Sequence, residues 1–359
     1  MGNERQIIDI HHHIIPKVYR DALKSIGVTT AGGFPIRKWE PQDSINMMDE
    51  LNIDVGYTSI SEPATIPFKK KKAAKVARQV NEYQAQLKKD YPDRFKSFAL
   101  VPMPYVKETI KEIEYALDVL GLDGVGLFSN YGTEFLGNDA FEKVMATLNE
   151  RHAKVFIHPS SNSADFKPPQ YVVADFIQEF TFNTTRAATN LIFSGTLERY
   201  PNIKFILAHA GGTLPYIQWR VHNTLETQKY IIQDPKKRLK SFMNNGKTEI
   251  VKEVIKHPVR YAKMFNLYRN GLQPSKTLTK TASEYMSHFY YDIGLSTGSS
   301  TFSSLKEVTT TPHIVFGSDA HYAPNHWIAK MIQDIESTNA FSENEKKDIF
   351  SQNTMHLFK

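Results

Sequence analysis

Cysteine is absent from this chain of 359 residues. That absence excludes a disulfide framework, a thiolate metal ligand and a cysteine nucleophile, so any bound metal must use histidine and carboxylate side chains. Long apolar runs are missing too, since no stretch approaches the roughly 18 residues that a membrane-spanning helix needs. The start, MGNERQIIDI, lacks the basic and then apolar segments of a signal peptide. We therefore expect a cytoplasmic protein with no membrane partner.

The composition that remains is typical of a globular enzyme. Hydrophobic residues make up 41% and charged residues 23% of the chain, which excludes a disordered protein. A single α/β barrel contains roughly 250 residues and exceeds 400 with insertions, so this length fits one large domain. We interpret residues 1–359 as that single domain.

The net charge of +6 is unevenly distributed. Residues 229–280 contain thirteen lysines and arginines against three acids, so this segment carries +10 and the rest of the chain carries −4. A basic segment interleaved with aromatics could bind nucleic acid. No nucleic-acid-binding motif accompanies it, so we interpret it as a solvated helical insertion and expect no nucleic-acid partner. The run Lys69 to Lys72 is likewise interpreted as a solvated helix face.

Eight short β-rich runs alternate with helical patterns along the chain. They span residues 7–13, 55–61, 95–103, 124–129, 154–160, 204–211, 289–296 and 314–320. Most are continuously apolar, as strands buried on both faces are, and residues 69–90 and 105–120 between them show helical periodicity.

Eight such β-then-α units predict a (β/α)8 barrel, the TIM barrel. The two long connections, at about 14–54 after strand 1 and 212–288 between strands 6 and 7, are then insertions. A doubly wound open sheet is the alternative, but the glycine-rich first turn of that fold is absent.

Histidine and aspartate side chains occur where several of these strands end. In the first strand, Asp9, His11 and His13 alternate, and a period of two places all three on one face. The other strand ends carry His158, His209 and Asp319. Active sites of this fold lie at the carboxyl ends of the strands, so we expect these groups to converge. Imidazoles with one carboxylate predict a first-row divalent metal, because Ca²⁺ prefers oxygen ligands alone.

Each histidine also has a simpler interpretation. Three consecutive histidines could be a tag remnant, but a tag would not be embedded in an apolar strand. A single buried histidine is more often a hydrogen-bonded core residue, and it is the coincidence on four strands that favours a site. His12 should point outward and be structural, whereas His321 is of interest because it follows Asp319 at the predicted mouth.

Two rival catalytic motifs are absent: the sequence has no HExxH and no GxxxxGK[ST]. Four blocks instead match a known family in order: IDIHHHIIP at 8–16, VFIHP at 155–159, YPNIKFILAHAGGTLPY at 200–216 and VFGSDAHYAP at 315–324. On these blocks the chain resembles the amidohydrolase superfamily, in its aminocarboxymuconate-semialdehyde decarboxylase-like branch. The blocks at 124–132, 136–141 and 182–203 are most similar to 6-methylsalicylate and γ-resorcylate decarboxylase-like members.

The resemblance implies roles for particular residues. One metal ion would be bound by His11, His13, His158 and Asp319. A catalytic histidine, His209, would stand beside it, and Asp319 would also take part in catalysis. Substrate-binding groups would come from Arg220, eleven residues after His209, and from Arg37 and Trp39 in the first insertion. Relatives assemble as dimers or larger, so we expect a homo-oligomer.

The fourth predicted strand reads GVGLFSNYG and contains no lysine that could bridge two metals when carboxylated. We therefore expect one divalent ion, with Zn²⁺ first and Mn²⁺ second in the order of affinity.

Two enzyme hypotheses use this site. In the first, the ion and Arg220 bind a small aromatic or unsaturated carboxylic acid, which loses CO2 without oxidation while Asp319 or His209 supplies a proton. In the second, the ion activates water to hydrolyse a lactone, amide or ester. The ligands alone do not discriminate, and the family blocks favour decarboxylation. A third hypothesis, a non-catalytic binding module, would use the basic insertion.

Overall fold

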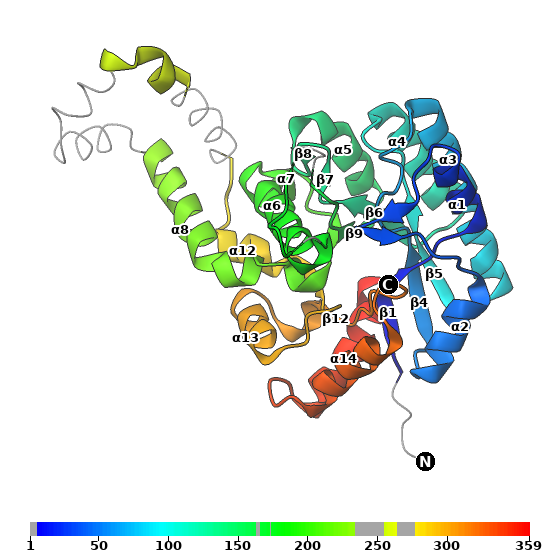
Figure 1. The fold of residues 1–359 in the computed structure, drawn as a ribbon. Helices are drawn as coiled ribbons and strands as arrows, with labels where there is room; N and C mark the ends of the chain where they lie inside the picture. Colours follow the sequence, from blue (N-terminus) through cyan, green and yellow to red (C-terminus); the bar gives the residue numbers. More distant parts are fainter. Residues whose placement is uncertain (1–5, 163–165, 173, 234–254, 264–276) are drawn as a thin grey trace.

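A computed structural model describes residues 6–162, 166–172, 174–233, 255–263 and 277–359. Eight parallel strands form one sheet in chain order (Figure 1). They are β1 (Ile8–His13), β4 (Val55–Ser59), β5 (Phe95–Leu100), β6 (Gly124–Phe128), β9 (Lys154–His158), β10 (Lys204–Leu207), β11 (Tyr290–Asp292) and β12 (Ile314–Val315). All eight predicted strands are thus confirmed, most of them shorter at the carboxyl end than the sequence indicated.

The sheet closes between its first and last strands. The Ile10 N–H donates to the Phe316 carbonyl at 3.0 Å, and the Asp319 N–H donates to the His11 carbonyl at 2.9 Å. A parallel bridge between His12 and Ala320 continues the pairing beyond β12. The predicted (β/α)8 barrel is confirmed.

Helices surround the strands (Figure 1). The predicted helix at 69–90 is α3 (Lys70–Asp90), which buries Ala73, Val76, Ala77, Val80 and Leu87 at helical spacing. The predicted helix at 105–120 is α4 (Val106–Glu114) followed by a π-helical turn, Tyr115–Val119. Later strand connections contain α5 (Glu142–Glu150), α6 (Glu179–Phe193), α7 (Thr196–Arg199), α8 (Leu214–Gln233), α12 (Ala282–Ser287) and α13 (Ser299–Val308). After the last strand come α14 (Asn325–Ser337), α15 (Glu343–Lys347) and α16 (Asn353–Leu357).

Apolar side chains fill the barrel interior at the amino end of the strands. Six of the eight strands contribute large side chains to this cluster: Ile8, Ile10, Tyr57, Phe98, Phe156, Ile206 and Val315. Such a filled layer makes the interior a packed core and not a pore. The polar groups of the strands are left at the carboxyl end.

The first insertion, 14–54, contains α1 (Lys17–Lys24), β2 (Thr30–Ala31), β3 (Phe34–Pro35) and α2 (Pro41–Glu50). Strands β2 and β3 form a hairpin joined by Gly32 and Gly33, whose φ angles are 53° and 86°. Positive φ at both central residues is what the common two-residue hairpin turn requires, and glycine adopts it at no steric cost.

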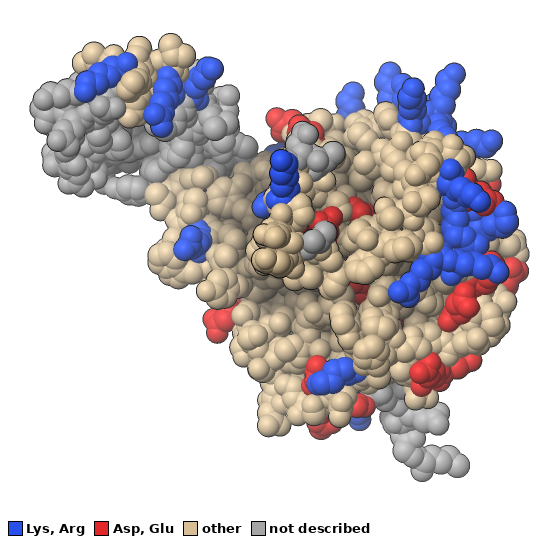
Figure 2. Space-filling view, in the orientation of Figure 1, with Lys and Arg blue, Asp and Glu red and all other residues tan. Residues whose placement is uncertain are grey.

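Much of the second insertion, and with it most of the basic segment 229–280, lies outside the described residues. At its edges, Lys229 donates to the Lys280 carbonyl and pairs with Glu226. Elsewhere, lysine and arginine side chains stand out along the side of the molecule formed by α1, α3 and α4 (Figure 2). Within the run Lys69 to Lys72, three of the four lysines are exposed, as predicted for a solvated face. No helix in the described part of the chain is long and apolar enough to cross a membrane.

Candidate metal-centred active site

Strand β1 contains a bulge that decides which side chains face the barrel interior. Asp9 pairs with Gly56 of β4, but His12 pairs with Thr58, so two residues of β1 lie opposite one residue of β4. The alternation of side chains therefore shifts within the strand. The prediction that Asp9 lies on the same face of the strand as His11 and His13 is wrong.

Asp9 instead forms a buried pair with His12 on the outer side of the strand. Asp9 Oδ2 accepts hydrogen bonds from His12 Nδ1 at 3.0 Å and from Ser318 Oγ at 2.6 Å. His12 Nε2 lies 2.8 Å from Ser44 Oγ on α2. Burial raises the pKa of Asp9, but the hydrogen bond and charge of His12 outweigh it and lower the pKa overall. His12 thus has the structural role that the sequence predicted.

Four side chains converge at the carboxyl end of the barrel: His11, His13, His158 and Asp319. Each is buried, and one ligand atom from each lies within 4.8 Å of the others. The Nε2 atoms of His11 and His13 are 2.9 Å apart, and each is 3.2 Å from Asp319 Oδ1. The structure therefore brings together all four residues that the sequence proposed as metal ligands.

The second nitrogen of each imidazole has a hydrogen-bond partner that orients the ring. The partners are Asp292 Oδ2 for His11 (3.1 Å), Ser59 Oγ for His13 (3.0 Å) and the Pro159 carbonyl for His158 (2.7 Å). Metal-bound histidines have such partners as a rule, because the partner fixes the tautomer and leaves the other nitrogen for the ion. Three oriented imidazoles and one carboxylate fit a divalent first-row cation.

Asp292, at the end of β11, was missed in the sequence. It is the only acid in the predicted strand 289–296. A single acid in an otherwise apolar strand was the sequence signal that could have indicated a functional role. Besides orienting His11, its Oδ1 accepts hydrogen bonds from the Gly294 N–H at 2.8 Å and the His209 N–H at 3.3 Å. Asp292 thereby connects a predicted ligand to the turn that carries the predicted catalytic histidine.

Gly317 allows this connection to form. A Cβ atom at this position would lie 2.7 Å from His11 Cβ and 3.0 Å from Asp292 Oδ1. Both of these side chains are completely buried. The glycine of the GSD sequence at 317–319 is therefore required by close packing.

The electrostatics suit metal ligation. Burial lowers the pKa of His13 to about 4, and that of His158 falls well below its ordinary value for the same reason. Burial opposes ionisation of Asp319, but the charge of His11 and three imidazole hydrogen bonds bring its pKa well below the ordinary value. Burial also lowers the pKa of His11, yet the charges of Asp292 and Asp319 raise it overall to about 10. The two carboxylates thus create a site that favours a cation.

His209 stands beside this cluster without being one of its four members. Its Nε2 lies 3.3 Å from Asp319 Oδ2, and its Nδ1 is buried with no hydrogen-bond partner among the described residues. The backbone φ angles of His209 and Asp319 are 54° and 58°. Such left-handed conformations are uncommon for residues with a Cβ and concentrate at functional sites. This geometry fits the catalytic position predicted for His209.

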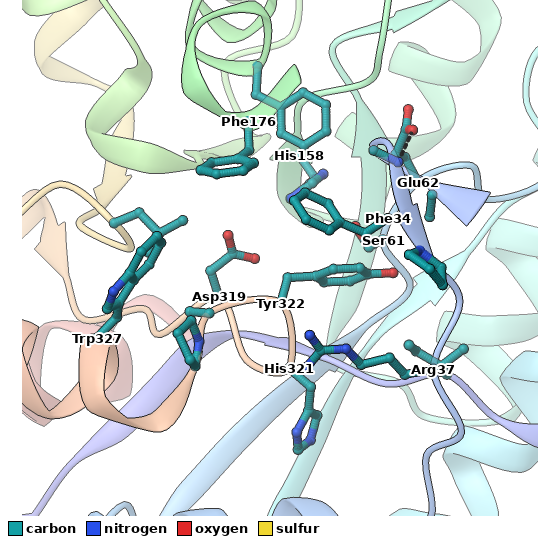
Figure 3. Close-up of a pocket in the computed structure, with 18 residues that line it drawn as sticks. Phe34, Arg37, Ser61, Glu62, His158, Phe176, Asp319, His321, Tyr322 and Trp327 are labelled. Carbon is teal, nitrogen blue, oxygen red and sulfur yellow. Dashed lines mark hydrogen bonds between the residues drawn. The ribbon is translucent and has the colours of Figure 1, made fainter. Parts of the chain in front are cut away.

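A cavity of about 250 Å³ opens beside the cluster. Its polar lining includes Arg37, Glu62, His158, Asp319 and Tyr322, and its apolar lining includes Phe34, Phe176, Phe180, Leu295 and Trp327 (Figure 3). Pockets for drug-sized ligands measure roughly 300–1,000 Å³, so this one suits a smaller molecule such as a single substituted ring. Burial raises the pKa of Tyr322, which keeps its hydroxyl protonated.

The remaining predicted substrate-binding residues lie in different places. Arg37 lines the cavity, as predicted. Trp39 is buried behind the cavity wall, where its Nε1 donates to Ser44 Oγ at 3.0 Å and to His321 Nε2 at 3.1 Å. His321 itself lines the cavity, and burial lowers its pKa to about 3. Trp39 therefore contacts the cavity only through His321, which serves as a partner for its buried indole N–H.

Arg220 is not brought to the cavity within one chain. It is exposed on α8, where it borders a surface groove together with Trp219 and Asn223. Arg220 follows the start of α8 by six residues, or roughly 9 Å of helix. Arg220 is not among the residues that line the cavity beside the cluster.

A (β/α)8 barrel with a His3Asp cluster at the carboxyl ends of its strands defines a class of metal-dependent enzymes. Residues 8–226 match the amidohydrolase family model. The chain belongs to this family, and its resemblance to the decarboxylase branch is confirmed by curated relatives.

Decarboxylase yanB of Aspergillus niger is 30% identical over 364 residues, which cover 98% of this chain and 87% of that protein. The 6-methylsalicylic acid decarboxylase of Penicillium expansum is 30% identical over 355 residues, which cover 98% and 95%. Among solved structures, 5-carboxyvanillate decarboxylase of Novosphingobium aromaticivorans, complexed with manganese and 4-hydroxy-3-methoxy-5-nitrobenzoic acid, has a TM-score of 0.76. That structure is 17% identical and covers 100% of this chain and 97% of its own, so it shows the same fold.

Proposed function

We propose that this protein is a metal-dependent carboxy-lyase that removes CO2, without oxidation, from a small aromatic carboxylic acid. The observation that carries the proposal is the oriented His3Asp cluster at the edge of a small, aromatic-walled cavity that also contains Arg37. The names of the curated relatives support decarboxylation. We further propose that residues 1–359 act as one catalytic domain in the cytoplasm.

Each group then has a definite task. His11, His13, His158 and Asp319 would hold a divalent ion, which would supply Lewis-acid charge for a bound carboxylate substrate. Arg37 donates hydrogen bonds to the carboxylate, and the aromatic walls hold the ring and exclude water. As the bond to the carboxyl carbon breaks and CO2 departs, the pair of His209 and Asp319 delivers a proton to the ring carbon.

A mononuclear hydrolase of a lactone, amide or ester would use the same ligands, and solvent deuterium separates the two reactions. We expect wild-type enzyme in heavy water to place deuterium on the product carbon that carried the carboxylate, because a decarboxylase must protonate that carbon. Mass spectrometry and NMR of the product check this. Hydrolysis forms no new carbon–deuterium bond, so a turned-over ester or lactone with undeuterated carbons would overturn the proposal.

We propose one bound ion per chain, zinc first and manganese second. The cluster offers four protein ligands, and β6 has no lysine to form a bridge. Affinity favours zinc over manganese, while manganese in a structural neighbour supports a divalent ion without deciding which. We expect elemental analysis of purified protein to find about one ion per chain. Two tightly held ions per chain would contradict the mononuclear site.

We propose a homodimer or larger assembly that uses the exposed face of α8. The side chains of Tyr216 and Trp219 on this face are 84% and 68% exposed, and exposed aromatic patches mark protein interfaces. In such an assembly Arg220 could contact a carboxylate in a neighbouring chain. We then expect Arg220→Lys to raise KM with metal content unchanged, because an ammonium lacks the planar two-bond geometry of arginine. A monomer by light scattering at micromolar concentration would exclude this role.

A further inference from the structure

Glu62 lies three residues beyond the end of β4, in the lining of the cavity, and joins two separate segments of the chain. Its Oε1 accepts a hydrogen bond from the Gly32 N–H at 2.8 Å, and its Oε2 accepts one from the Ser161 N–H at 2.8 Å. Gly32 belongs to the β2–β3 hairpin, which follows β1, whereas Ser161 follows β9. In Figure 3, Glu62 lies near Ser61 and Phe34 and apart from Asp319. The carboxylate therefore ties together two segments that meet above the strands.

The β2–β3 hairpin is followed closely by Arg37, which the proposed reaction uses to bind the substrate carboxylate. Phe34 lines the cavity and packs against Phe176, with ring centroids 5.8 Å apart, and Arg37 follows three residues later. Among the described residues, Arg37 makes no hydrogen bond or ion pair of its own. The backbone that carries Arg37 therefore sets the point from which its side chain reaches the cavity.

That backbone is held at two points. On the carboxyl side of Arg37, Arg20 Nη1 donates to the Trp39 carbonyl at 2.6 Å. On the amino side, the hairpin pairs only two residues in each strand, and a two-stranded hairpin is marginally stable by itself. The Glu62 carboxylate supplies the polar anchor there, and hydrogen bonds to an ionised acceptor are roughly twice as strong as neutral ones.

We infer that Glu62 is a positioning residue, which holds Arg37 at the cavity by fixing the β2–β3 hairpin to the barrel. The inference rests on the proposed function only in taking Arg37 as the group that binds the substrate carboxylate. Glu62 acts through Arg37, so its replacement should weaken carboxylate binding only while Arg37 is present.

A double-mutant cycle tests this with metal-loaded full-length protein and 2-hydroxybenzoate as the probe. Calorimetry measures the Kd for wild type, Glu62→Gln, Arg37→Ala and the double variant. Glutamine has one carbonyl oxygen and can accept only one of the two N–H groups well, so we expect Glu62→Gln to raise Kd roughly tenfold. In the Arg37→Ala background the same change should have no further effect, because the two residues are coupled.

Hydrogen exchange gives a second readout independent of binding. In Glu62→Gln, amides of residues 29–36 should exchange faster than in wild type, because the anchor of the hairpin is weakened. Glu62→Asp keeps the charge but is one methylene shorter, so it should give the same two results and replaces Glu62→Gln if that variant does not fold.

Glu50→Gln is the matched control. Glu50 Oε2 accepts a hydrogen bond from Asn325 Nδ2 at 2.6 Å and lies outside the cavity lining, so its replacement should leave Kd unchanged. An equal rise in Kd for Glu62→Gln with and without Arg37, or faster exchange with unchanged Kd, would overturn the inference. So would an Arg37→Ala variant that binds as wild type does. Failure to release CO2 from any aromatic acid would count against the proposed reaction while leaving the binding cycle valid.

Discussion

Replacing Asp319 by asparagine is expected to lower turnover by roughly 10²–10⁴-fold, the contribution typical of a general acid–base group, while part of the bound metal remains. The two oxygens of Asp319 face different partners: Oδ1 lies 3.2 Å from Nε2 of both His11 and His13, and Oδ2 lies 3.3 Å from His209 Nε2. Asparagine keeps the shape and one coordinating oxygen. It loses the negative charge and the carboxylate oxygen that can accept and release a proton.

Turnover and elemental analysis of the same preparation measure the two effects separately. Asp123→Asn is a suitable control, because Asp123 precedes β6 at the amino end of the barrel, where its Oδ2 accepts from Lys88 and the Ser97 N–H. That variant should retain its turnover. If Asp319→Asn keeps full metal content and full turnover, Asp319 has no part in proton transfer.

Replacing His209 by asparagine is expected to lower turnover by a similar factor, roughly 10²–10⁴-fold, with metal content unchanged. His209 is not among the four converging ligand groups, but its Nε2 is within reach of Asp319 Oδ2. Its buried Nδ1 has no partner within the described part of the chain, and such groups are rare in folded proteins and need a specific explanation. A role in catalysis supplies that explanation.

The two variants also test each other. If His209 and Asp319 act as one proton-transferring unit, the double variant should be no slower than the slower single variant, because groups that act together are strongly non-additive. Independent roles would instead multiply the two losses. Loss of the metal from His209→Asn would make His209 a ligand and reassign the cluster.

The sequence by itself determined the barrel and the main members of the site. Continuous apolar runs separated by helical periodicity are local signals, because burial on both faces requires apolar side chains at successive positions. The groups at the strand ends, His158 and Asp319 among them, could be predicted because parallel strands in a barrel bring their carboxyl ends to one mouth. The matching family blocks added the prediction that His209 is catalytic.

The tertiary structure alone decided the remaining features. The face of Asp9 depends on a bulge, which is a property of the register between β1 and β4 and leaves no mark in the spacing of the sequence. Asp292 is 281 positions from the imidazole that it orients, and only its place as the single acid of its strand hinted at a role.

The different places of Arg37 and Arg220, both predicted to bind substrate, were likewise beyond the sequence. A helix carries Arg220 along the surface, while a hairpin anchored by Glu62 leads to Arg37 at the cavity. The spacing of residues in the sequence predicts which of them share a face of one strand or helix. Contacts between distant segments depend on how strands register and how connections pack over them, and these are fixed only when the whole chain folds.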